Sequence, residues 1–225
     1  MITSKKRARS GRLSAFAMSA MMLGGCSILT PVSAPAPSLY SFDSATSLPF
    51  IHSRPLSGNN IKAPTLVISV PRAAAGFDSH RMAYMRHPHQ LEYFRQSEWI
   101  AVPGAMLSPL IVAALERSGQ FGAVVQAPTS TVGQLRLDVE IIRLQQEFFS
   151  IPSQVHVSLR AHLLDATTRQ VIAWREFDVL IASASEDPYG GVIATNRAIS
   201  VLMQELTDFC TQAVTDQSLH LHPIR

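Results

Sequence analysis

Alternating apolar and polar residues mark three strands in the second half of the chain. Residues 134–148 alternate until the phase changes near Ile141, which predicts a strand with a β-bulge at that point. Residues 154–163 carry apolar side chains at every second position and polar ones between them, the pattern of a strand with one face in water. The turn-forming residues 165–170 connect this strand to residues 171–181, so we expect two long antiparallel strands here.

Shorter strands are predicted in the first half. Residues 39–42 are a short strand candidate, and the nearly continuous apolar run Thr65–Val70 predicts a strand buried on both faces. Residues 81–86 and 91–95 flank a His-Pro-His-Gln sequence, which favours a β-hairpin. Between the first two strands, residues 44–63 are rich in proline, glycine and asparagine, so we expect a mobile surface loop.

One helix is predicted in the middle of the chain. Pro103 and Gly104 break the strand pattern, after which apolar residues recur three and four positions apart until Gly119 ends the helix. Pro109 lies inside this pattern, so either the first turn is loose or Ser108 caps a helix that begins at Pro109. The apolar positions are Leu107, Leu110, Ile111, Ala114 and Leu115.

A second helix is predicted near the end of the chain. Asp187 and Pro188 suit the N-cap and first positions, and an apolar stripe from there reaches about Val214. Strands interrupted by two amphipathic helices predict an α+β domain, with a mixed, largely antiparallel sheet and the helices packed on it. We place this single domain at residues 38–216 and a flexible tail at 217–225.

The first 25 residues have the composition of a targeting signal. An apolar run of 11 residues, 13–23, follows a basic segment without acids, and it is too short to span a bilayer, which needs about 20 residues. Leu23-Gly24-Gly25-Cys26 follows directly, an order that resembles a bacterial lipoprotein signal. We therefore expect cleavage before Cys26, a diacylglycerol on its sulfur and acylation of the new amino group. The alternative is cleavage after Ala34 to release a soluble periplasmic protein, but Pro35 would then follow the cut.

Removal of residues 1–25 changes the charge balance. The whole chain has 19 basic and 16 acidic residues, and five of the basic ones lie in the signal, which leaves 14 against 16 and a net charge of −2. The basic pI is therefore no argument for nucleic-acid binding. Residues 26–37 are proline-rich, which predicts an extended tether. Its 11 residues after Cys26 can span roughly 34 Å.

Residues that could carry chemistry do not form a recognisable set. His87 and His89 are two positions apart, but the intervening proline favours a turn, and no cysteine or acid pair completes a metal site. No nucleophile elbow, zinc-protease motif or phosphate loop occurs. Cys210 lies on the apolar stripe of the last helix, which indicates a buried, inert thiol. We therefore predict no catalytic residue, metal site or cofactor, apart from the acyl groups on Cys26.

The predicted hairpin interleaves arginine with aromatic residues. This arrangement fits either ordinary sheet packing or a contact surface for a protein or lipid, in which Met, Tyr, Trp and Arg are favoured. Outside the cytoplasm, a nucleic-acid surface is excluded. The candidate partner-binding residues are Tyr84, Arg86, Tyr93 and Trp99.

This hairpin, read together with Cys26, resembles the ABC-type transport auxiliary lipoprotein family, which includes the lipoproteins that accompany paraquat-inducible and other MCE-type transporters. The resemblance covers about residues 39–214. The matching segments are Tyr40-x-Phe42, Leu66-Val67-Ile68-Ser69-Val70, Arg81-Met82-Ala83-Tyr84-Met85-Arg86, Leu91-Glu92-Tyr93-Phe94, Trp99, Leu137-Asp138-Val139, Gln146-Glu147-Phe148, Ala194-x-Asn196-x-Ala198 and Leu202.

The resemblance implies a non-enzymatic accessory lipoprotein on the periplasmic face of the outer membrane. Its implied partner is an MCE-domain protein that, with an ATPase and a permease, moves phospholipid or other hydrophobic substrates between membranes. Phospholipid contact and a homo-oligomer are compatible with it. Ser27 after Cys26, in place of an aspartate, favours outer-membrane sorting. The residues leave two alternatives open: a scaffold or activator of a cell-wall synthase or secretion machine, and a periplasmic hydrolase.

Overall fold

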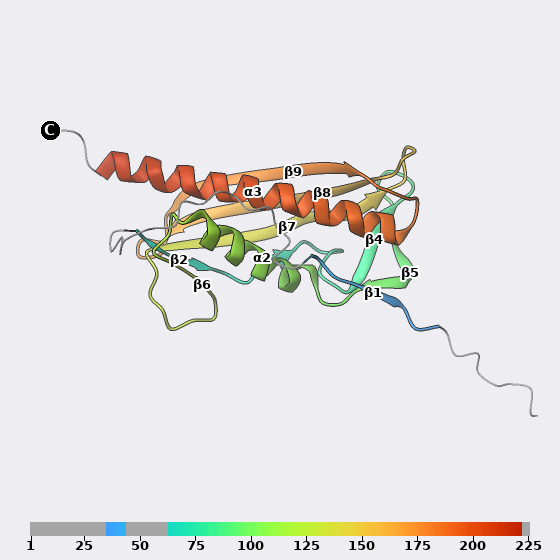
Figure 1. Ribbon diagram of the computed structural model, residues 1–225, viewed down its shortest axis with the longest axis horizontal. Coiled ribbons are helices and arrows are strands. Elements are labelled where there is room, and N and C mark those ends of the chain that lie inside the picture. Colours follow the sequence, from blue (N-terminus) through green and yellow to red (C-terminus); the bar gives the residue numbers. More distant parts are fainter. Residues whose placement is uncertain (1–34, 44–62, 222–225) are drawn as a thin grey trace, which may run out of the picture. The chain divides into compact units, whose positions relative to one another are not determined.

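Three long antiparallel strands form the largest part of the sheet in the computed structural model (Figure 1), which describes residues 35–43 and 63–221, with side chains to residue 216. They are β7 (Leu135–Glu147), β8 (Gln154–Asp165) and β9 (Val171–Ala182). The register of β7 against β8 shifts between Ile141 and Arg143, which confirms the predicted β-bulge. At the tight turn into β9, the Asp165 Oδ1 atom accepts backbone N–H groups at 2.8 and 2.7 Å.

The other edge of β7 is shared by three strands in turn. Its start pairs in parallel with β2 (Thr65–Ile68), and its middle pairs in parallel with the two-residue β3 (Arg72–Ala73). On its far side, β2 pairs in parallel with β6 (Ala123–Gln126). Leu66 and Ile68 are fully buried, and the strand ends before the predicted Val70, which is exposed.

The end of β7 pairs in parallel with β4 (Arg81–Met85). An antiparallel hairpin joins β4 to β5 (Leu91–Trp99), as predicted, although β5 is longer than expected. The short β1 (Ser38–Tyr40) then pairs in parallel with the end of β5. The residues nearest the predicted tether are therefore fixed to the hairpin.

The middle helix, α2 (Pro103–Ser118), begins earlier than either alternative drawn from the sequence. Pro103 occupies its first turn, where the missing N–H group costs nothing, and Pro109 lies inside the helix. Gly104, expected to break the pattern, is helical and lies so close to β3 that a Cβ atom would be 2.3 Å from the Pro71 carbonyl oxygen. Gly119 ends the helix in the left-handed conformation, with φ of 65°, as predicted.

The last helix, α3 (Pro188–Leu221), begins as the sequence indicates. The Asp187 Oδ1 atom accepts the Gly190 N–H at 2.7 Å, the geometry of an N-cap. Hydrogen bonds from Gly190 N–H and from Ser185 lower the pKa of Asp187. The helix continues past Val214 to Leu221, so its backbone extends into the segment assigned to the tail.

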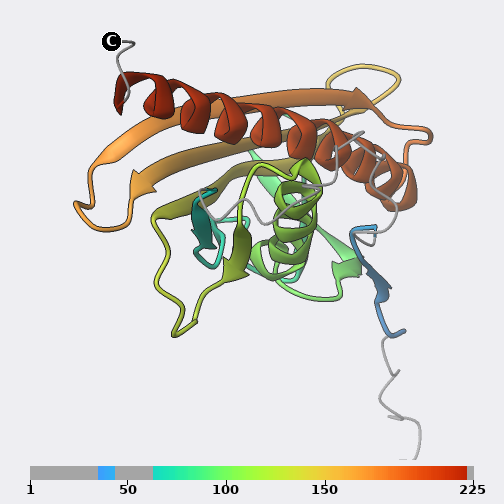
Figure 2. The ribbon, with the colours of Figure 1, turned by 60° about the vertical axis from the view of Figure 1, so that its left-hand side comes forward.

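Both helices cover the same face of the sheet. α3 packs across β8 and β9, while α2 packs beside α3 against β6 and β3 (Figures 1 and 2). One apolar core lies between the layers, with contributions from both helices and from β1 through β9. The described residues from Pro37 onward form one compact unit, and the predicted α+β class with a mixed, mostly antiparallel sheet is confirmed.

Within the described ranges, no helix is both long enough and apolar enough to cross a bilayer. The predicted signal at 1–25, Cys26 and nearly all of the loop at 44–63 lie outside the described residues.

Candidate functional site

Three aromatic rings hold the β4–β5 hairpin to the end of β7. Tyr84 lies 4.4 Å from Phe94 and 5.9 Å from Phe148, measured between ring centroids, and the contact with Phe148 is edge to face. The Tyr84 hydroxyl donates a hydrogen bond to the Glu92 carboxylate at 2.8 Å. This hydrogen bond, together with burial of the ring, raises the pKa of Tyr84. The ring of Tyr84 is thus an internal support of the hairpin.

Two arginine side chains lie over the hairpin tyrosines. The Arg81 guanidinium carbon is 3.7 Å from the centroid of the Tyr93 ring, and that of Arg86 is 5.3 Å from the Tyr84 ring. Both distances are within the range of cation–π attraction. The Tyr93 hydroxyl also donates to the Gly76 carbonyl at 3.1 Å, which fixes the ring beside the preceding loop.

The four sequence-predicted contact residues fall into two groups. Trp99 is 4% exposed and meets Phe42 edge to face at 5.2 Å, and Tyr84 is 8% exposed, so both act through packing in this conformation. Arg86 is exposed and Tyr93 is half-buried, so these two remain accessible to a partner. Their role in partner binding stays a prediction.

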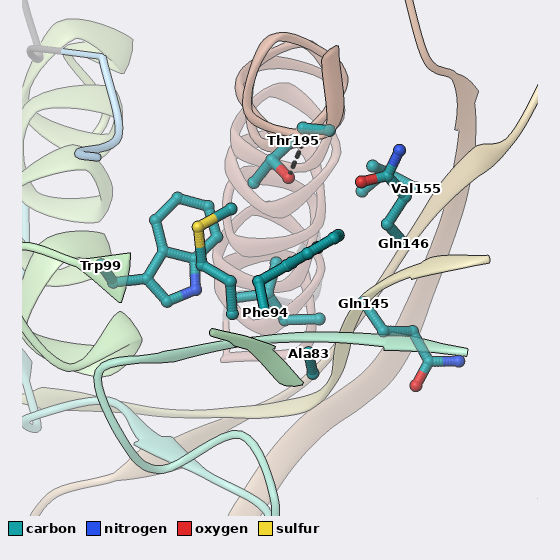
Figure 3. Close-up of a pocket in the computed structure, with 10 residues that line it drawn as sticks. Ala83, Phe94, Trp99, Gln145, Gln146, Val155 and Thr195 are labelled. Carbon is teal, nitrogen blue, oxygen red and sulfur yellow. Dashed lines mark hydrogen bonds between the residues drawn. The ribbon is translucent and has the colours of Figure 1, made fainter. Parts of the chain in front are cut away.

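A narrow pocket lies between the hairpin and the first turns of α3 (Figure 3). Its volume of about 10 Å³ is close to the room that one water molecule needs, so it does not accept an acyl chain. Gln146 lies in its wall and donates from Nε2 to the hydroxyls of Ser153 and Ser183, while its Oε1 atom has no hydrogen-bond partner among the described residues. Its lining residues are Met82, Ala83, Phe94, Trp99, Leu144, Gln145, Gln146, Val155, Gly191 and Thr195.

A wider cleft of about 310 Å³ opens beside α2 and α3. The Asn196 side chain on α3 accepts the backbone N–H of Asp43 at 2.8 Å, which ties the segment after β1 to the helix. The apolar part of the wall consists of Leu110, Ile193 and Ile199, and Arg197 supplies a cation. The cleft borders Asp43, where the described chain stops, and we assign it no ligand.

The face of the sheet opposite the helices is polar and largely paired. His156 meets the Asp178 carboxylate at 2.7 Å through Nε2 and the Glu147 carboxylate at 3.0 Å through Nδ1. Burial opposes ionisation of Asp178, but hydrogen bonds from Ser158 and His156 outweigh it and lower the pKa of this carboxyl. Arg160 pairs with Glu176 at 3.0 Å on the same face.

Trp174 on β9 is an exposed aromatic residue that the sequence reasoning did not single out. It is 64% exposed and stacks on His162 of β8 at 6.4 Å. The sequence pattern could have indicated its exposure. Trp174, Glu176 and Asp178 alternate along β9 and pair with the polar positions of β8, and residues paired across two strands share a face.

No candidate metal site gathers in the described part of the chain. His87 and His89 are exposed in the β4–β5 turn, and no group of three or more His, Cys, Asp or Glu side chains in the described ranges has the arrangement of a metal site. Glu186 accepts the Ser153 N–H at 2.8 Å, so it links two loops. Cys210 is fully buried in the core, and burial raises the pKa of its thiol to about 12.

We expect the Cys210 thiol to react at least about 100-fold more slowly with an alkylating reagent in the native protein than in denaturant, because attack requires local opening and a thiolate. Mass spectrometry of the peptide that contains Cys210 measures both rates separately from Cys26. Native labelling as fast as labelling in denaturant would contradict the buried position.

Comparison with known proteins places these features in a family. The family model for the ABC-type transport auxiliary lipoprotein component matches residues 47–207. A search of curated proteins finds no match. Protein XCC0632 from Xanthomonas campestris is similar in structure, with a TM-score of 0.68 at 22% identity over 80% of this chain and 98% of that chain. An uncharacterised protein has a TM-score of 0.59 at 14% identity over 78% of this chain and 99% of that chain. These two structures have the same fold as this chain.

Proposed function

This chain belongs to the family of ABC-type transport auxiliary lipoprotein components, and from that membership we propose that it is a non-enzymatic accessory subunit of an MCE-type intermembrane lipid transport system. The observation that carries the proposal is the family match over 47–207, which includes the hairpin, both helices up to residue 207 and all the long strands. The partner in this proposal is the MCE-domain protein of the transporter, which moves phospholipid or other hydrophobic substrates.

The proposed location is the periplasmic face of the outer membrane. A cleaved signal at 1–25 and acyl chains on Cys26 supply the anchor, since two or more chains hold a protein on a membrane almost permanently. Pro35 and Pro37 are exposed and lead directly into β1, which supports a tether between the anchor and the domain. Ser27 supports sorting to the outer membrane.

The proposed contact with the partner lies on the exposed side of the hairpin. Tyr93 and the Arg81 guanidinium stacked on it form a rigid pair of the residue types that dominate protein interfaces. The hydrogen bond from Tyr93 to Gly76 keeps the ring in place before binding, so little side-chain entropy is lost on contact.

The proposal is tested by cross-linking intact envelopes, purifying the lipidated protein and identifying its partners by mass spectrometry. We expect an MCE-domain protein among the cross-linked species. Recovery of a cell-wall synthase or secretion components in its place would overturn the transport role and leave the fold unaffected.

A second variant tests the anchor. Cys26→Ser removes the sulfur that accepts diacylglycerol, so we expect the chain to remain unprocessed or to appear in the soluble fraction. Fractionation of envelopes with detection of the processed form measures this. A Cys26→Ser chain that is still matured and still found in the outer membrane would show that the anchor lies elsewhere.

A further inference from the structure

The side-chain amide of Gln146 at the end of β7 is only half satisfied. Gln146 is 3% exposed, and its Nε2 atom donates to the hydroxyls of Ser153 at 3.0 Å and Ser183 at 3.3 Å. Its Oε1 atom is buried and accepts no hydrogen bond from the described residues. Nearly all buried amide oxygens in proteins have a hydrogen-bond partner, because an unpaired one lowers stability, so a donor is expected beside this atom.

The Oε1 atom borders the narrow pocket behind the β4–β5 hairpin. Figure 3 shows this oxygen on the side of the amide that faces α3, where the Thr195 hydroxyl also lies. Thr195 is 3% exposed, and its hydroxyl donates to the Gly191 carbonyl at 2.9 Å. The proton of that hydroxyl is therefore committed, and only its lone pairs remain available. Two buried acceptors thus line one pocket, and they cannot hydrogen-bond to each other.

The backbone N–H groups at the start of α3 have other acceptors. The Asp187 carboxylate accepts the Gly190 N–H at 2.7 Å, and the Asp187 carbonyl accepts the Gly191 N–H at 3.1 Å. The helix backbone nevertheless passes directly beside the Gln146 amide, because a Cβ atom on Gly191 would lie 2.4 Å from Oε1. The donor that suits this pocket must therefore come from outside the chain.

We propose that the pocket binds one internal water molecule, which donates one proton to Gln146 Oε1 and the other to Thr195 Oγ1. The volume of about 10 Å³ suits a single water molecule, and two polar partners are enough to hold one. Two acceptors without a donor disfavour an anion, and two oxygen atoms are too few for a calcium or magnesium ion. The bound water joins the end of β7 to the first turns of α3, directly behind the hairpin.

Oxygen-17 magnetic relaxation dispersion of the full mature protein in detergent micelles tests the proposal, because its amplitude counts the water molecules held inside the protein. Thr195→Val keeps the shape of the side chain and removes one acceptor, so we expect the amplitude to fall by the contribution of one water. Gln146→Met removes the other acceptor and is expected to give the same loss. An amplitude equal to that of the native protein in both folded variants would overturn the proposal.

Thr207→Val is the matched control on the same helix. Thr207 is also 3% exposed and donates to the Met203 carbonyl at 2.7 Å, but it does not line the pocket. We expect its replacement to leave the amplitude unchanged. An equal loss in Thr207→Val and Thr195→Val would overturn the assignment of the water to this pocket.

A crystal structure of the native protein at about 1.2 Å resolution tests the same site without a substitution. We expect density for one water about 2.8 Å from both Gln146 Oε1 and Thr195 Oγ1. A Gln146 amide turned by half a rotation would instead donate from Nε2 to Thr195 and accept from the two serine hydroxyls. That arrangement satisfies the amide without a water, and its observation would overturn the proposal.

Discussion

Trp99→Ala is expected to lower the free energy of unfolding by about 3–5 kcal/mol, the usual cost of removing a large aromatic side chain from a core. Trp99 is 4% exposed, lies against Phe42 and lines the pocket next to α3. Its loss therefore leaves a cavity at the junction of β1, β5 and α3. The midpoint of urea denaturation, followed by circular dichroism, measures the change.

The second tryptophan provides the control. Trp174 is 64% exposed on the outer face, so Trp174→Ala is expected to change the free energy of unfolding by no more than about 0.5 kcal/mol. Equal stability of the two variants would contradict the core position of Trp99. If the folded fraction of Trp99→Ala still recovers the proposed MCE-domain partner, Trp99 acts through packing, whereas loss of recovery would indicate direct contact.

Gly104→Ala is expected to destabilise the protein by about 2–3 kcal/mol, although alanine is by about 1 kcal/mol the better helix former. A Cβ atom at this position would lie 2.3 Å from the Pro71 carbonyl oxygen, so α2 must move away from the backbone that leads into β3. A shift of the thermal midpoint by several degrees checks this result.

The neighbouring residue separates crowding from helix propensity. Ala105 is exposed on the same turn of α2, and Ala105→Gly is expected to cost only about 1 kcal/mol from propensity. If Gly104→Ala proved more stable than the native protein, the close approach of α2 to Pro71 would be wrong.

Local patterns were sufficient to predict the elements whose burial repeats regularly. In β8, Val155, Val157 and Leu159 face the helices, while His156 and Ser158 between them lie on the opposite, polar face and bind Asp178, so the alternation revealed both the strand and its orientation. The N-cap at Asp187 and the end of α2 at Gly119 were predictable because each depends on one residue and its own backbone.

The remaining arrangement depends on contacts between distant segments. The parallel pairing of β2 with β7 joins residues about 70 positions apart, and the two residues of β3 have no pattern of their own. The start of α2 was missed for the same reason. Glycine at position 104 disfavours a helix locally, and only the nearby Pro71 carbonyl explains why it is required.

The candidate site shows the same limit. Tyr84 and Arg86 are two residues apart in sequence, and alternation alone would place them on one face. Because β4 lies between β5 and β7, Tyr84 is covered by Phe94 and Phe148, whereas Arg86 lies beyond the end of the strand and stays exposed. Residue type could therefore indicate a cluster of aromatic and cationic side chains but not which of them reach the surface.

Among the described strands, β9 pairs only with β8, so a 12-residue strand offers its free backbone groups to any other strand that approaches. Such an edge is a template for aggregation unless charges oppose it. Arg175, Glu176 and Asp178 are exposed in the middle of β9, and a second copy of the strand would have to bury them. The proposed lipid anchor would confine many copies to one plane at high local density, where these charges would oppose edge-to-edge association.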